Sequence, residues 1–214
     1  MDEEISIIDK KTRDEKIKDF FIKNKKLLLS TIIILILTVL SFYSYQIYKD
    51  KQKEWLSEKY NSAIIKYKSG DKFKTIVSMK EVIEDKDSTY SPLALYFLID
   101  NNLIENQKEV NELFDKLINK TSLETEIKHL IIYKKALYNA DFIKENDLIG
   151  MLKPITSSDS VWKSHALYLL AEYFYSKNEK QKSKDFFNKI LSTENANKDI
   201  IKEAQKRLNR DLSE

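Results

Sequence analysis

The sequence contains no cysteine, only two glycines and only two prolines among 214 residues. Without cysteine the chain can form neither disulfide bonds nor thiolate metal sites, and it cannot carry a lipid on a cysteine. An all-β domain needs many turns, which glycine and proline supply, so their scarcity favours helices. The two glycines lie 80 residues apart, which excludes a glycine-rich phosphate-binding loop.

An excess of charge of one sign is also missing, because a chain that is 33% charged has a net charge of only +3. Such a balance gives no strong field to attract nucleic acid, so we expect no nucleic-acid partner. The only two histidines, His129 and His165, do not lie in a metal-binding spacing. Ser164 beside His165 is no nucleophile–base pair, since adjacent residues of a helix point apart. We therefore expect no enzyme, no metal, no cofactor and no small-molecule substrate.

Charge is absent altogether from the 22 residues Leu27–Tyr48. As a helix this segment would be about 33 Å long, which is enough to cross the hydrocarbon core of a bilayer. The alternative is a cleaved signal peptide, whose apolar stretch covers about 7–15 residues and ends at small residues. The stretch here is longer, and Phe42–Tyr48 offers no such site. We predict an uncleaved membrane anchor.

The charges beside the anchor indicate its orientation. Eight Lys or Arg residues lie in the twenty positions before it and six in the twenty after it. This bias favours a cytoplasmic N-terminus, and a long C-terminal domain can translocate whatever its charge. We predict a cytoplasmic tail at 1–26, a transmembrane helix at 27–48 and a domain at 49–214 outside the cytoplasm. The alternative is the opposite orientation, in which the domain faces the cytoplasm and has a regulatory role.

Small and hydroxyl side chains recur on one stripe of the predicted membrane helix. The stripe consists of Thr31, Ile34, Thr38, Ser41 and Tyr45. Such residues let a second helix approach closely and form hydrogen bonds with it, so the stripe is a candidate contact face for a membrane partner. The alternative is that the hydroxyl groups bond only to the backbone of their own helix.

After the anchor, apolar residues keep a helical spacing almost throughout, which predicts an all-α domain. The helices form hairpins with a period of about 35 residues, the size of a tetratricopeptide unit, and such hairpins must stack to bury their apolar faces. The last helix is more polar and would cap the stack. Three of the expected helices are marked by one end only: the first is capped by Ser91 with Pro92 at its first position, the second is opened by Thr121 or Ser122, and the third ends before Pro154. The other expected helices are Trp55–Tyr67, Phe73–Ile83, Val110–Ile118, Trp162–Lys177, Lys180–Ser192 and Asp199–Leu212.

One hairpin, from Leu167 to Asn195, resembles a tetratricopeptide repeat closely. Asn178 stands at the turn, where a left-handed backbone conformation is needed that asparagine tolerates. Ala171 and Ser183 are the small residues that let the two helices approach. The residues expected to pack within the repeat are Leu167, Leu170, Ala171, Phe174, Ser183, Phe187 and Ile190.

The layout of the whole chain resembles the ancillary Sec translocon subunit family. The features that carry the resemblance are the tail beginning at Asp2, the basic and aromatic approach around Phe20 and Phe21, the single membrane helix and the degenerate repeats with the best one near the C-terminus. The resemblance implies a bacterial inner-membrane protein with a periplasmic tetratricopeptide-like domain. It also implies translocon subunits, periplasmic chaperones and exported client proteins as partners.

Aromatic residues are plentiful in the domain, and at helical spacing most of them are expected in the core. Tyr168, Tyr173 and Tyr175 flank the core line of their helix and are the candidates for a groove that holds client segments. The sequence thus predicts a membrane-anchored scaffold that binds proteins at the export channel. The alternative is a structural adaptor of the cell envelope, for division or outer-membrane assembly, whose helix is only a tether.

Overall fold

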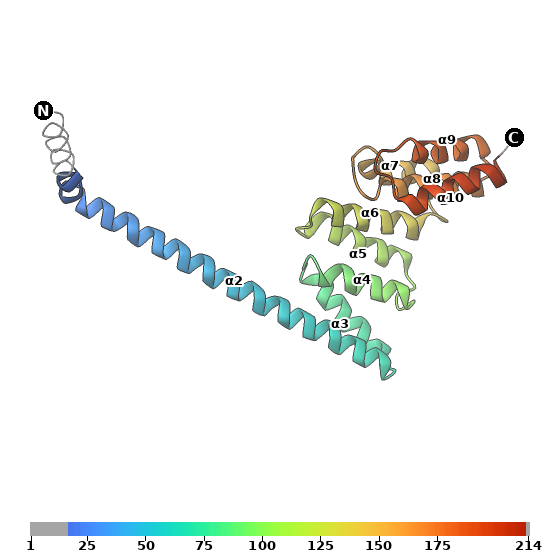
Figure 1. Ribbon diagram of the computed structural model, residues 1–214. Coiled ribbons are helices and arrows are strands. Elements are labelled where there is room, and N and C mark those ends of the chain that lie inside the picture. Colours follow the sequence, from blue (N-terminus) through green and yellow to red (C-terminus); the bar gives the residue numbers. More distant parts are fainter. Residues whose placement is uncertain (1–16, 213–214) are drawn as a thin grey trace, which may run out of the picture. The chain divides into compact units, whose positions relative to one another are not determined.

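The computed structural model describes residues 17–212, and over these residues the protein is all-helical, with no strand (Figure 1). Helix α2, Lys25–Lys68, contains the whole uncharged stretch. This helix is long and apolar enough to cross a membrane, and none of its most apolar window is buried. Residues 17–23 are also helical and expose Ile17, Phe20 and Phe21. Residues 1–16 of the predicted cytoplasmic tail lie outside the described residues.

By its internal contacts the chain divides into two units between Trp55 and Leu56. The second unit, called the domain below, begins with the last part of α2, where Leu56 and Ala63 are fully buried. Eight further helices follow. They are α3 Lys72–Glu84, α4 Tyr90–Asp100, α5 Gln107–Lys120, α6 Thr125–Asn139, α7 Glu145–Thr156, α8 Lys163–Ser176, α9 Lys180–Leu191 and α10 Lys198–Asp211.

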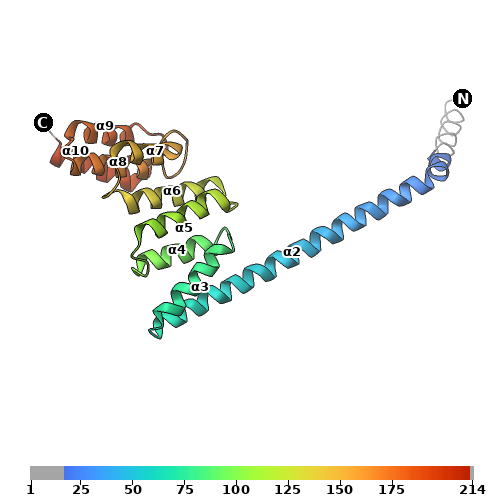
Figure 2. The ribbon, with the colours of Figure 1, turned by 180° about the vertical axis from the view of Figure 1, so that it is seen from behind.

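Within the domain each helix from α3 to α10 packs against the next one in the chain. Helix α8 also contacts α6 and α10. The two views from opposite sides show α4, α5 and α6 lying side by side (Figures 1 and 2). The apolar interior forms three successive clusters, centred on α3 to α5, on α6 to α8, and on α8 to α10. Each helix is too short to be stable alone, so the burial between neighbours holds the domain together.

The α8–α9 hairpin has the local features that its sequence predicts. Asn178 has a φ of 62°, which confirms the left-handed turn. The Asn178 N–H donates to the carbonyl of Tyr175 (3.0 Å) and the Glu179 N–H to that of Phe174 (2.9 Å), so the last carbonyls of α8 are satisfied. All seven residues expected to pack within the repeat are buried: Leu167, Leu170, Ala171, Phe174, Ser183, Phe187 and Ile190.

Two predicted helix starts are wrong. Ser91 does not cap α4, because its buried hydroxyl donates to the carbonyl of Val82 (2.7 Å) and accepts from the N–H of Asp87 (2.9 Å). The carboxylate of Asp87 instead accepts from the N–H of Tyr90 (2.7 Å), at the start of the helix. Neither Thr121 nor Ser122 opens α6, which begins at Thr125 with Glu124 as its cap. Ser91 is held by a tertiary contact instead, and Thr121 is the C-cap of the preceding helix α5.

The predicted end of α7 is also wrong. The helix continues through Pro154 to Thr156, although proline cannot donate a helical hydrogen bond. Ile155, directly after the proline, is fully buried in the second apolar cluster. Proline lies in the last turn, so its cost is a single bond near a helix end, and the burial of Ile155 offsets that cost.

Candidate protein-binding surfaces

The stripe on α2 is exposed along its whole length. Thr31 Oγ1 donates to the carbonyl of Leu27 (2.9 Å), and Thr38 Oγ1 donates to that of Ile34 (2.8 Å). Both threonine hydroxyls therefore bond to their own backbone, as the alternative interpretation expects. Ser41 and Tyr45 are exposed as well, with Lys49 Nζ 5.5 Å from the centre of the Tyr45 ring. The stripe offers a partner small side chains, with two of its hydroxyls already engaged.

The three tyrosines predicted to line a client groove do not form one surface. Tyr173 is buried at 8% exposure, and its hydroxyl donates to the carbonyl of Ile143 (3.1 Å) at the start of α7. Its position is that of a core residue. Tyr168 and Tyr175 are partly buried against the third apolar cluster, on the side of α8 that α10 covers. The chain's own last helix thus occupies the place that the sequence left open for a client.

An arginine of α10 fastens this contact. Arg207 forms two parallel bonds to the carboxylate of Glu172 on α8, Nε to Oε1 (2.7 Å) and Nη2 to Oε2 (2.9 Å). Its guanidinium also lies 4.3 Å from the centre of the Tyr175 ring and pairs with Asp211. Two-bond pairing and stacking on an aromatic ring are the contacts that guanidinium makes best. The arginine therefore holds α10 as a cap on α8.

Burial and then the neighbouring Glu172 carboxylate raise the pKa of Tyr168 to about 12. The phenol therefore stays neutral at every physiological pH. The hydrogen bond from Arg210, together with the charge of Arg207, holds the pKa of the Asp211 carboxyl below its usual range, so this residue stays ionised. The α8–α10 contact thus combines the ion pairs of Arg207 with the burial of apolar side chains in the third cluster.

Four other aromatic side chains are linked by ring contacts in the first part of the domain. Tyr60 and Tyr67 lie on α2, and Tyr90 and Phe97 lie on α4, each pair seven residues apart and hence on one helix face. The ring centres of Tyr60 and Tyr90 are 6.0 Å apart, those of Tyr60 and Phe97 are 6.5 Å apart, and those of Tyr67 and Phe97 are 5.3 Å apart. We call these four residues the aromatic face.

All four residues of the aromatic face are partly buried, so each ring rests on the domain and keeps part of its surface in solvent. Burial raises the pKa of Tyr60, which therefore remains a neutral phenol. Partly exposed tyrosines combine an apolar ring with a hydroxyl, and such residues are enriched where proteins bind proteins. The sequence already showed the seven-residue spacing in both segments, but it did not show that the two helices would bring the pairs together.

A second aromatic group joins α6 to the start of α8. The ring of Tyr133 stacks on that of Trp162 at 6.1 Å, and the imidazole of His165 lies 5.2 Å from the Trp162 ring. Burial lowers the pKa of His165 below its usual 6.5, so the imidazole favours its neutral form. His129 is also buried, with Nδ1 3.8 Å from Glu126 Oε1. Over residues 17–212 there is no group of three or more acidic, His or Cys side chains that could hold a metal ion.

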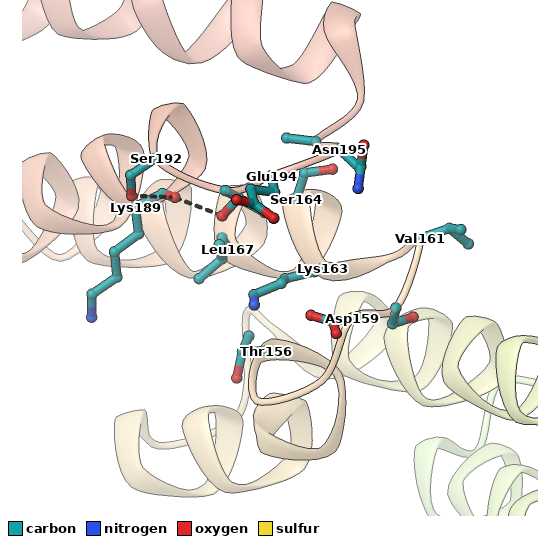
Figure 3. Close-up of a pocket in the computed structure, with 13 residues that line it drawn as sticks. Thr156, Asp159, Val161, Lys163, Ser164, Leu167, Lys189, Ser192, Glu194 and Asn195 are labelled. Atoms are coloured by element: carbon teal, nitrogen blue, oxygen red, sulfur yellow. Dashed lines mark hydrogen bonds between the residues drawn. The ribbon is translucent and has the colours of Figure 1, made fainter.

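A polar pocket with a volume of about 530 Å³ lies between the α7–α8 turn and the α9–α10 turn (Figure 3). Asp159 and Lys163 line it from one side, and Lys189 and Glu194 from the other. The carboxylates and ammonium groups balance one another, so the pocket selects neither an anion nor a cation. Ser164 also lines the pocket and accepts a hydrogen bond from the Asn197 N–H (3.3 Å). Its chemistry indicates a solvated junction between two turns.

Comparisons with known proteins give no relative. No protein-family model matches the chain, and no curated protein and no solved structure is significantly similar to it.

Proposed function

We propose that this protein is a membrane-anchored scaffold whose helical domain, a stack of tetratricopeptide-like hairpins, binds other proteins. Helix α2 carries the proposal. It contains a 22-residue uncharged stretch whose most apolar part is not buried at all, and its final part is built into the domain core. The region where a signal peptide would be cleaved, 42–48, lies inside this helix, which runs without a break from the uncharged stretch to the buried Leu56 and Ala63. A retained anchor explains this continuous helix.

The aromatic face supplies the binding surface of this proposal. Anchoring confines the domain to two dimensions, so weak contacts with a second membrane-bound protein are strengthened by a high effective concentration. Partly exposed aromatic rings suit such contacts, because they bury a large area at little cost in side-chain entropy. The proposal therefore needs no catalytic group and no cofactor.

A finer form of the proposal follows from the resemblance to the ancillary Sec translocon subunits. In this form the N-terminus is cytoplasmic, the domain is periplasmic, and the partners are translocon subunits, periplasmic chaperones and exported clients. The distribution of Lys and Arg around the anchor supports the orientation. The second candidate is an envelope adaptor for which α2 is only a tether, and the two internally bonded threonines of the stripe favour it.

A pull-down of the full-length protein in mild detergent tests the proposal. The native protein is compared with a copy in which Leu27–Tyr48 is replaced by an unrelated membrane helix, and with the variant Tyr60→Ser/Tyr67→Ser. We expect translocon subunits with the native protein, their loss with the exchanged helix, and loss of the partners that bind the domain with the tyrosine variant. The exposed Phe142→Ser is the matched control and should change nothing.

Two outcomes would redirect the proposal, and a third would overturn it. If the native and exchanged forms bring down the same division or envelope-assembly proteins without translocon subunits, the adaptor replaces the export scaffold. If protease added to spheroplasts leaves the domain whole, the domain faces the cytoplasm. If none of the three forms retains any partner, protein binding itself is wrong.

A further inference from the structure

Helix α3 begins with an exposed strip that is both basic and apolar. Phe73 is 76% exposed and Val77 is 42% exposed, and their spacing of four residues places them on one face of the helix. The exposed lysines Lys68 and Lys72 lie beside the turn that precedes this face. We call Lys68, Lys72, Phe73 and Val77 the basic–apolar strip.

The charge at this turn is concentrated. Residues 66–74 hold four lysines and one aspartate, a charge of +3, which equals the net charge of the whole chain. All the other residues of the protein therefore balance one another. Lys74 Nζ pairs with Asp71 (2.9 Å), and Lys66 Nζ donates to Ser78 Oγ (3.2 Å). Over residues 17–212, Lys68 and Lys72 have no ion-pair partner and are free for a partner's carboxylates.

The same face of α3 is closed further along the helix. Positions 73, 77, 80 and 84 follow one another on the face, and the last two pair with α5 through Lys80–Glu109 and Glu84–Lys116. Neighbouring helices thus cover the second half of the face and leave the first half open. At Gly70, in the turn itself, an added side chain would meet nothing within 4 Å. The strip is therefore accessible from the turn onward.

We propose that the basic–apolar strip docks a protein segment in which carboxylates alternate with large apolar side chains. Charge complementarity selects the acidic side chains, and burial of the Phe73 ring supplies apolar contact area. The apolar surface continues along α3 to Val77, which suits a chain segment laid along the helix more than lipid head groups touching a single tip. This inference extends the proposed protein binding to a second surface, and it does not depend on the aromatic face.

The test uses full-length protein in nanodiscs of zwitterionic lipid and a fluorescent 18-residue peptide of alternating glutamates and leucine–phenylalanine pairs. Binding is followed by anisotropy at low and at high salt. Lys68→Glu/Lys72→Glu should weaken binding by about tenfold or more at low salt, with a smaller effect at high salt, because exposed charges are screened. Phe73→Ser should weaken binding by about fivefold at both salt concentrations, because the apolar contact is not screened.

Matched controls separate this surface from the others. Lys202→Glu reverses an exposed lysine on α10, and Phe142→Ser removes an exposed ring elsewhere, so neither should change binding. A peptide with lysines in place of glutamates should not bind. Loss of peptide binding in Tyr60→Ser/Tyr67→Ser, with the strip variants unaffected, would overturn this inference and leave the proposed function standing.

Vesicles provide the last arm of the test. The nanodisc-held protein is mixed with vesicles containing one fifth anionic lipid. If the strip variants lose vesicle binding while the acidic peptide fails to bind the native protein, the strip is a lipid-binding surface and the docking of a protein segment is wrong. Peptide binding that all variants retain equally would also overturn the proposal.

Discussion

The first and the last complete hairpins of the domain are built by the same local rules but end in different surroundings. In the first, the Gly70 N–H donates to the Tyr67 carbonyl and the Asp71 N–H to the Lys66 carbonyl, each at 3.0 Å. Asn178 and Glu179 repeat this pattern after α8. Gly70 and Asn178 both have positive φ, at 89° and 62°. Local sequence therefore closes the two turns in the same way.

The neighbours of the two hairpins differ. Helices α8 and α9 lie between α7 and α10, and their large side chains Phe174 and Phe187 are buried. Helix α3 packs against the end of α2 and against α4, and it forms ion pairs with α5, but Phe73 at its start stays in solvent. A hairpin of this kind cannot bury both of its faces by itself, so the exposed one is available to a partner. The α8–α9 end of the domain is therefore covered by the chain's own helices, whereas the start of α3 is left uncovered.

The largest expected effect tests this difference directly. Phe187→Ala should lower the free energy of unfolding by about 3–5 kcal/mol, because it leaves a cavity in a closed core. Phe73→Ala, the same substitution in the open hairpin, should change it by no more than about 0.5 kcal/mol. Denaturant unfolding of the full-length protein in detergent, followed by tryptophan fluorescence, measures both. Similar losses in the two variants would show that the first hairpin is covered too.

The second effect concerns the closing of the last hairpin by α10. Arg207→Met should cost about 1–3 kcal/mol, because it removes charged hydrogen bonds and leaves Glu172 without its partner. Arg207→Lys should recover only part of this, since an ammonium group cannot form the two parallel bonds. The denaturation midpoints of the three proteins give the comparison. If the lysine variant is as stable as the native protein, the two-bond geometry does not matter.

The sequence predicted the hairpins better than their surroundings. The bounds of α8, α9 and α10 were predicted to within about two residues, because Asn178 marks the turn and the apolar spacing is regular. Ser91 and Pro154 gave wrong helix ends for a tertiary reason. The carbonyl of Val82 takes the hydroxyl of Ser91, and burial of Ile155 extends α7 past its proline. Local signals set turns, whereas burial can move helix ends.

The candidate surfaces were harder to predict for the same reason. In an isolated α8 helix Tyr168 and Tyr175 would be exposed, but in the domain they pack against the cluster that α10 shares, and Arg207 lies over Tyr175. The four rings of the aromatic face come from helices whose proximity no local pattern reveals. A single sequence shows which side of a helix a residue is on, but not which helix will lie against that side.

The turns themselves give a smaller effect that sharpens the comparison. Asn178→Ala and Gly70→Ala should each cost about 1 kcal/mol, because alanine is disfavoured at positive φ. Asn178→Gly should be nearly neutral, since glycine adopts this conformation freely. The shift in the denaturation midpoint measures all three. A neutral Gly70→Ala beside a costly Asn178→Ala would show that the first turn can rearrange, as an uncovered hairpin would allow.

The smallest effect is a dependence of stability on pH within the covered part of the domain. Because burial lowers the pKa of His165 below 6.5, the unfolded chain takes up a proton that the folded domain resists. The free energy of unfolding should therefore be unaffected by this group above pH 6.5 and should decrease as the pH falls below it. His165→Phe keeps a ring beside Trp162 and should remove this part of the decrease. Thermal midpoints of both proteins between pH 8 and pH 5 provide the measurement, and His129, present in both, cancels from the difference. Parallel curves would mean that His165 meets solvent freely enough to be protonated without cost, and that the junction of α6 and α8 is as open as the first hairpin.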